Sequence, residues 1–311
     1  MAAAPVTTRP APVSADAGES GRAPGLFFLL GAGKSGTNWA GRVLNLHPRI
    51  FVDGEFHFEF FYEAFARFTG ADWQVGHRPA VRTEARAALN DLVRRTMLAA
   101  ARGRPGLAVV GDRSPRWFQV LVPGAPHIYM IRDGRDVLVS HMFNYLRVIL
   151  PEHVPDHLRA PYLENVERFK ANPLEFGPEN PGLLGNEEWV RHFASRWAEQ
   201  LRHDLQRIEQ YREGPLRSPV LQIRYEVLHK EPEATRAAMY RFLGMDPSEA
   251  APLSTETATT PGFGREDRTK FNRKGAVGDW RNFATDKFRR WVKEKAGSTL
   301  IELGYERDMN W

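Results

Sequence analysis

The sequence predicts an α/β fold, a three-layer sandwich in which helices cover both faces of a central parallel sheet. Short apolar runs alternate along the chain with longer stretches of helical character. Buried strands separated by helices in this way are typical of parallel βαβ units. The first apolar run also leads directly into a glycine-rich turn, as expected at the carboxyl edge of such a sheet. With 311 residues, the chain is long enough to bury a full core.

Strands are expected at the apolar runs, and helices in the stretches that follow or precede them. A helix follows the glycine-rich turn after the first run, and another follows the turn after Arg132. The expected strands are 26–30, 50–52, 107–111, 127–131 and 220–225. The expected helices are 36–46, 79–101, 115–122, 134–147, 186–212, 233–243 and 285–303.

Three segments fall outside this alternation. Residues 1–24 are rich in Ala, Pro, Ser and Gly and lack the apolar core of a secretory signal, so we expect a disordered leader. The remainder, 25–311, is expected to form one domain. Residues 148–185 and 250–282 lack clear periodicity. Irregular segments of that length in a domain are usually lids, binding segments or disordered regions.

Composition limits the possible partners and the chemistry. The formal net charge of +5 favours an anionic partner, such as a nucleic acid, a membrane surface or a phosphorylated cofactor. The absence of cysteine excludes disulfides, thiolate catalysis and cysteine-bound zinc. The histidines have no metal-ligand spacing, so no metal site is expected. No apolar run approaches the roughly 20 residues of a membrane span, and a cytoplasmic enzyme is therefore expected.

The first motif is the turn after the first strand, Gly31-Ala-Gly-Lys-Ser-Gly-Thr37. Glycines let the backbone approach an anion, and the free N–H groups of a helix start point toward it. Lys34 adds a charge, and Ser35 and Thr37 add hydroxyl donors. The strict nucleotide triphosphatase pattern is not met, because Phe28 stands where its first glycine belongs. We therefore predict a phosphate-binding loop without a γ-phosphate and Mg²⁺; the alternative is a turn that only links strand to helix.

Two further motifs carry cations and hydroxyls. Arg132 ends a strand at the sheet edge, where it could hold a phosphate, and Ser140 follows on the next helix. The alternative is a local Arg–Asp network in which Asp133 or Asp136 caps that helix. Near the end of the chain, Arg273-Lys-Gly275 places two cations beside a glycine, and Gly278-Asp-Trp280 is expected to be a turn anchored by a buried tryptophan.

In this order, the three motifs resemble those of the sulfotransferases that use 3′-phosphoadenosine 5′-phosphosulfate (PAPS), and the resemblance extends over nearly the whole chain after the leader. The resemblance implies a P-loop-like loop for the 5′-phosphosulfate, a grip on the 3′-phosphate, a tyrosine beside the adenine and a C-terminal clamp. The implied cofactor-binding residues are Gly33, Lys34, Ser35, Gly36, Thr37, Asn38, Trp39, Arg132, Ser140, Tyr225, Arg273, Lys274 and Gly275.

Transfer to an acceptor also requires a general base that takes the acceptor's proton, and a further resemblance implies which residue this is. Residues 111–116 contain no histidine, unlike the segment of cytosolic sulfotransferases that carries the catalytic histidine. Glu55-Phe-His-Phe58 is instead similar to the Glu-x-His-Phe motif of the carbohydrate branch, so Glu55 is the implied base and His57 its alternative or partner. If this segment is extended, Glu55 and His57 project to one face. A buried glutamate there would be a well-tuned base; the alternative is a structural ion pair.

The resemblance implies an enzyme that transfers a sulfuryl group in line from PAPS to a hydroxyl or amine, with Lys34 stabilising the departing phosphate. We expect a small-molecule or carbohydrate acceptor, bound by residues within 56–78 and 144–185, and neither nucleic acid nor a metal. One alternative is a P-loop kinase that uses ATP and Mg²⁺, for which Asp112 is the weak candidate ligand. The other is a non-catalytic nucleotide- or polyanion-binding protein. The sequence predicts no oligomeric state.

Overall fold

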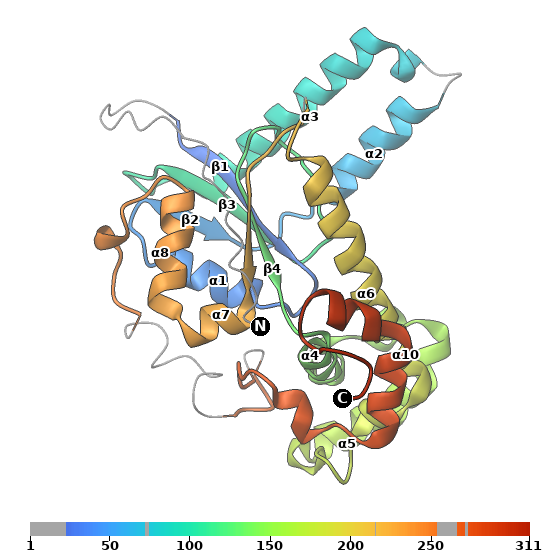
Figure 1. The fold of residues 1–311 in the computed structure, drawn as a ribbon. Helices are drawn as coiled ribbons and strands as arrows, with labels where there is room; N and C mark the ends of the chain where they lie inside the picture. The colour runs from blue at the N-terminus through green and yellow to red at the C-terminus, as the bar shows by residue number, and fades with distance from the viewer. Residues whose placement is uncertain (1–22, 72–74, 215, 254–265, 271–272) are drawn as a thin grey trace.

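The sheet at the centre of the computed structural model is parallel throughout its described strands and has the order β2-β3-β1-β4-β5 (Figure 1). The structure describes residues 23–71, 75–214, 216–253, 266–270 and 273–311. The strands are β1 (Gly25–Gly31), β2 (Ile50–Asp53), β3 (Val109–Ser114), β4 (His127–Ile131) and β5 (Val220–Arg224).

Helices cover both faces of the sheet, so the predicted three-layer α/β sandwich is confirmed (Figure 1). Side chains alternate along β1. Phe27 and Leu29 pack into one core, while Leu26, Phe28 and Leu30 pack into the other. The first core lies against α1 (Thr37–Leu44), α7 (Tyr225–Lys230) and α8 (Pro232–Phe242). The second lies against α3 (Pro79–Ala100), α4 (Gly134–Val148), α5 (Asp156–Ala171), α6 (Glu187–Gln210) and α10 (Asp286–Glu302).

The expected strands are all present; 127–131 has the expected bounds, and the ends of the other strands are shifted. β3 begins at Val109 and continues to Ser114, because Gly25 to Leu30 of β1 pair with the whole of that span. β5 ends at Arg224. Tyr225 was wrongly assigned to that strand, since it is the first residue of α7.

The predicted helix at 115–122 is wrong. This segment consists of bends and irregular backbone, and it is hydrogen-bonded to α6. The backbone N–H of Phe118 donates to Oδ1 of the buried Asp204 at 2.9 Å. Tyr129 of β4 donates its hydroxyl to the other carboxylate oxygen at 2.6 Å. These tertiary hydrogen bonds and the burial of Phe118 override the local sequence pattern.

Two helices lie in segments where the sequence predicted none: 148–185, which was expected to be irregular, and 56–78, which was expected to contribute to acceptor binding. In 148–185, α5 buries Leu158, Tyr162, Val166 and Phe169 at helical spacing, although Pro161 lies inside it. Its contacts with α4 stabilise a segment whose own sequence signal is weak. In 56–78, α2 (Glu59–Gly70) is mostly exposed and extends with α3 away from the sheet (Figure 1).

Two of the sequence predictions fall partly outside the described residues. For the predicted leader, 1–24, these are residues 1–22; for the expected irregular segment 250–282, they are 254–265 and 271–272. In the described part of the chain, no helix combines the length and the apolar character required to span a membrane.

The Asp204 contacts predict a large stability effect. Asp204→Ala leaves the Phe118 N–H and the Tyr129 hydroxyl buried without acceptors, so the free energy of unfolding should fall by about 2–4 kcal/mol. Glu209→Ala, on the exposed side of the same helix, should change it by less than about 0.5 kcal/mol. Urea unfolding of both variants measures this difference. Equal stability of the two variants would contradict the assignment.

Candidate active site

A cavity of about 400 Å³ opens where the loops leave the carboxyl ends of β1, β4 and β5. Ligands bind at this edge in open parallel sheets. The structure brings most of the sequence-predicted residues together here. Those that line the cavity are Gly33, Lys34, Gly36, Thr37, Asn38, Trp39, Glu55, Arg132, Ser140, Tyr225, Arg273, Lys274 and Gly275. Ser35 is buried within the loop, and neither Ser35 nor His57 belongs to the cavity lining.

The loop after β1 is tight because its glycines leave no room for side chains. A Cβ atom at Gly31 would lie 2.6 Å from Ser35 Oγ and 2.7 Å from the carbonyl oxygen of Met130. Lys34 adopts a left-handed conformation, with φ of 66°. Among the described residues, the buried Oγ of Ser35 has no hydrogen-bond partner. A bound oxyanion would satisfy that hydroxyl, so the loop suits a phosphate group.

Tyr225 fits against the start of α1. Gly36 caps this helix with φ of 98°, and a Cβ atom there would lie 2.3 Å from the Tyr225 ring. The Tyr225 hydroxyl donates to the carbonyl oxygen of Gly275 at 2.5 Å. One aromatic side chain therefore touches both the phosphate loop and the C-terminal motif.

Arg132 joins all three motifs. It is buried, and its guanidinium donates to the carbonyl oxygens of Lys34 and Ala276, both at 3.1 Å. Its carbon Cζ lies 4.3 Å from the centre of the Tyr225 ring. Burial alone would lower the pKa of Arg132, but its interactions with Tyr225 and with nearby carboxylates, including that of Asp136, raise it.

The two aspartates that follow Arg132 have structural roles. Asp133 caps α4 by accepting from the N–H of Arg135 at 2.9 Å. Asp136 accepts from the N–H groups of Gly278 and Trp280, at 2.7 and 2.9 Å. Trp280 is buried, which confirms the expected turn anchored by a tryptophan.

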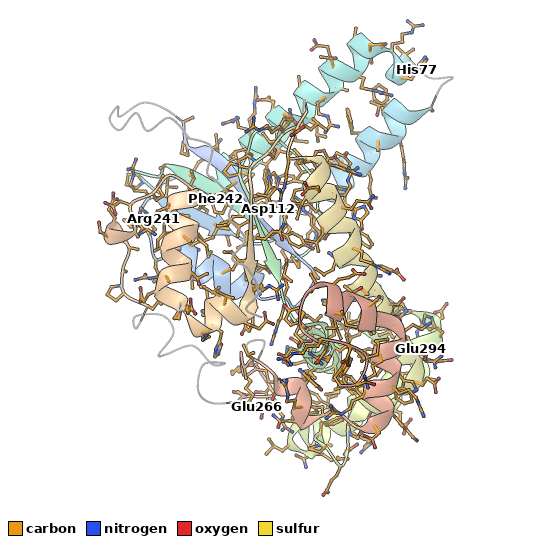
Figure 2. The ribbon with its side chains drawn as sticks, in the orientation of Figure 1. His77, Asp112, Arg241, Phe242, Glu266 and Glu294 are labelled. Atoms are coloured by element: carbon orange, nitrogen blue, oxygen red, sulfur yellow. The ribbon has the colours of Figure 1, made fainter. Side chains whose placement is uncertain are left out.

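The cations of the C-terminal clamp are already paired. Arg273 forms ion pairs with Glu266 (Figure 2) and Asp279, and it lies over the Phe143 ring at 4.4 Å. Lys274 Nζ lies 2.7 Å from Asp279 Oδ1. Burial would raise the pKa of Asp279, but Arg273 and hydrogen bonds from both cations outweigh it and lower the pKa to about 2. The clamp is therefore a preformed charge network.

Lys34 has a different environment. Its Nζ donates to Oδ1 of Asn144 on α4 at 2.9 Å. Burial lowers its pKa most, the charges of Arg147 and Arg132 lower it further, and Glu55 opposes them, so the pKa falls to about 7. Both protonation states are therefore populated near neutral pH.

Sequence reasoning named Ser140 but did not single out the polar stripe that continues from it along α4. Asn144 and Arg147 line the cavity at helical spacing from Ser140. A Cβ atom added at Gly33 would lie 3.3 Å from the ring of His141, which also lines the cavity. Burial, followed by the charge of Lys34, lowers the pKa of His141 to about 3, so its ring is neutral. The sequence signal that could have revealed this stripe was the helical spacing of polar residues in a helix whose other positions are largely apolar and buried.

Glu55 and His57 do not have the expected geometry. Glu55 lines the cavity, but its side chain is 37% exposed rather than buried. His57 has φ of 54°, so the segment turns there instead of remaining extended. Its Nε2 lies 3.8 Å from Glu55, and its Nδ1 lies 2.8 Å from Glu59. Arg113 of β3 is 3.7 Å from the other oxygen of Glu55.

Asp112 lies inside the protein body rather than in the cavity (Figure 2). It accepts from the Ser114 hydroxyl at 2.7 Å and pairs with Arg116 at 3.5 Å. A carboxylate in this position is unavailable to a nucleotide-bound metal ion. Within the described ranges, no three His, Cys, Asp or Glu side chains are grouped as a metal site would need.

Comparison with known proteins gives a consistent family. A family model described as "Sulfotransferase domain" matches residues 24–300. Sulfotransferase 1B1 of Mus musculus is 26% identical over 197 residues, which are 57% of this chain and 56% of that protein. Sulfotransferase 1B1 of Canis lupus familiaris is 24% identical over 195 residues, 56% of this chain and 55% of that protein. The chain thus spans about half the length of these curated relatives.

Solved sulfotransferase structures are also similar. Mouse sulfotransferase SULT7A1, solved with PAP, is 18% identical with a TM-score of 0.47, and the match covers 89% of this chain and 84% of that one. A sulfotransferase from Alicyclobacillus acidocaldarius is 19% identical with a TM-score of 0.44, and the match covers 92% and 97%.

The lowered pKa of Lys34 is measurable in the free protein. In ¹³C-lysine NMR, the Lys34 signal, identified by its loss in Lys34→Met, should titrate near pH 7. Because the side chain loses its proton as the pH rises through 7, the cavity should bind anions more weakly above that pH. Arg147→Met should raise this pKa by removing a repelling charge. Arg168→Met, on α5, serves as a control without effect, and a Lys34 pKa above 10 in the wild type would contradict the prediction.

Proposed function

The chain belongs to the sulfotransferase domain family, and from this premise we propose that it transfers a sulfuryl group from PAPS to a hydroxyl or amine of an acceptor. The observation that carries the proposal is one cavity that combines a tight phosphate loop with a separate set of cations. PAPS carries a phosphosulfate and a 3′-phosphate, and so needs two anion sites. We further propose that residues 25–311 form a single catalytic domain.

The residues of the loop would hold the phosphosulfate. Ser35 offers its unpartnered buried hydroxyl, and the start of α1 offers backbone N–H groups. The 3′-phosphate would be held by Arg132, Ser140 and the 273–275 segment, and Tyr225 would pack beside the adenine ring. When bound, PAPS supplies an activated sulfuryl group. The chain's own residues then position the acceptor and stabilise charge.

Lys34 would stabilise the transition state. Its ammonium group lies in the cavity beside the loop, and a partly buried charge acts more strongly there than in water. Negative charge on the departing phosphate would favour the protonated form. The hydrogen bond to Asn144 holds Nζ in the cavity until then.

Glu55 would remove the acceptor proton. Its carboxylate lines the same cavity as Lys34, and its charge acts on Lys34. The Glu-x-His-Phe context supports a position near the carbohydrate branch of the family, and with it a small-molecule or carbohydrate acceptor. Apolar side chains of the cavity wall, those of Pro115, Phe143 and Val148, would contact that acceptor.

Cofactor identity is tested by thermal unfolding. Adenosine 3′,5′-bisphosphate should raise the melting temperature, and EDTA should not abolish the effect. Gly36→Ala should lose most of this shift, because its Cβ would collide with Tyr225. Gly244→Ala is a matched control with positive φ and open space around the new Cβ, so it should keep the shift. Greater stabilisation by ATP with Mg²⁺ would favour the kinase alternative.

The base is tested by single-turnover transfer. PAPS is first incubated with a panel of phenols, aliphatic alcohols, sugars and amines to find an acceptor. Glu55→Gln should then slow transfer by roughly 10²–10⁴-fold while leaving bisphosphate affinity near that of the wild type. Glu294→Gln makes the same change on α10, outside the cavity lining (Figure 2), and should transfer at the wild-type rate. A wild-type rate in Glu55→Gln would refute the assignment.

A further inference from the structure

A chain of charged side chains leads from the cavity toward the interior of the protein. Glu55 Oε2 lies 3.8 Å from His57 Nε2, and His57 Nδ1 lies 2.8 Å from Glu59 Oε1. Glu59 Oε2 lies 3.5 Å from Arg116 Nη1, and Arg116 Nη2 lies 3.5 Å from Asp112 Oδ2. His57 therefore lies between two carboxylates, one in the cavity and one on α2.

The contact with Glu59 determines which nitrogen of His57 carries hydrogen. Burial would raise the pKa of Glu59, but the hydrogen bond from His57, its own backbone N–H and the charge of Arg116 lower it. An ionised carboxylate can only accept a hydrogen bond, so His57 Nδ1 must be the donor. In the neutral ring, Nε2 then carries the lone pair, and this atom faces Glu55.

Asp112 and Arg116 support the segment that carries Glu55, His57 and Glu59. Asp112 is fully buried and accepts from the backbone N–H of Phe56 at 3.4 Å, which ties the end of β3 to the segment between Glu55 and His57. His57 keeps its left-handed φ of 54° within this frame. A non-glycine residue in that conformation costs free energy, and such strain often accompanies a functional constraint.

We propose that His57 carries away the proton that Glu55 takes from the acceptor, and that Glu59 is the positioning residue that orients His57 for this transfer. The inference rests on the proposed function. As the acceptor oxygen bonds to sulfur, its O–H proton passes to Glu55, and the electron pair of the broken sulfur–oxygen bond stays on the departing phosphate.

The proton then passes from Glu55 to His57 Nε2, which restores the Glu55 carboxylate and makes an imidazolium stabilised by Glu59. The separation of 3.8 Å requires a small rotation of the Glu55 side chain or one bridging water. The His57 side chain is 51% exposed, so the proton can leave to solvent.

The tautomer of His57 can be measured without cofactor or acceptor. In ¹⁵N-histidine NMR, with His57→Asn to assign the signal, the neutral ring should carry its hydrogen on Nδ1. Glu59→Leu should move the hydrogen to Nε2. Hydrogen on Nε2 in the wild-type protein would overturn the proposal, and so would retention of the Nδ1 tautomer in a folded Glu59→Leu protein. The wild-type spectrum decides the matter even if the variant does not fold.

Single-turnover transfer to an acceptor from the panel tests the relay itself. His57→Gly suits the left-handed backbone and should slow transfer about 10–100-fold, and added imidazole should restore much of the rate. His57→Asn also tolerates this backbone but carries no proton, so it should be slow and gain nothing from imidazole. A wild-type rate in His57→Asn would overturn the relay.

The role of Glu59 has its own control. Glu59→Gln should slow transfer about 10-fold with unchanged bisphosphate affinity, because only the carboxylate stabilises the imidazolium. Glu63→Gln removes a charge from an exposed position on the same helix and should transfer at the wild-type rate. Equal rates in the two variants would count against the relay. Failure of the proposed function can be told apart from failure of the relay, because the wild-type protein would then not bind the bisphosphate at all.

Discussion

The site depends most on the buried guanidinium of Arg132. Its hydrogen bonds to the carbonyl oxygens of Lys34 and Ala276 tie the phosphate loop to the C-terminal motif, and its contact with the Tyr225 ring adds the start of α7. These three segments lie far apart in the sequence and meet only at the carboxyl edge of the sheet. A charged group held by backbone oxygens at this edge keeps the cavity formed before any ligand binds.

Charge is distributed unevenly around the cavity. Arg273 and Lys274 are paired with carboxylates, so they offer an anion a preorganised network whose charge is largely balanced. Lys34 instead lies among repelling arginines, and its pKa falls to about 7. An anion near Lys34 would therefore relieve repulsion as well as make a contact. This difference separates a region suited to holding a cofactor from one suited to stabilising charge that develops during a reaction.

The sequence contained much of this site. The three motifs and Glu55 were recognisable because each combines glycines, cations or carboxylates next to a strand end, and parallel strands bring such ends to one edge. The buried strands were also predictable, because short uninterrupted apolar runs such as 26–30 are typical of parallel strands that are buried on both faces. The order of layers followed from the alternation of strands and helices.

Tertiary structure decided what local pattern could not. Residues 115–122 are irregular because Asp204, on a distant helix, holds the N–H of Phe118, and α5 forms because its weak apolar face packs on α4. Asn144 and Arg147 belong to the cavity only because α4 turns that face toward Lys34. Likewise, the sequence determined that Glu55 and His57 are neighbours. The left-handed turn at His57 and its contact with Glu59 depend instead on tertiary contacts. These contacts come from Asp112 on β3 and from Arg116 in the segment that follows β3.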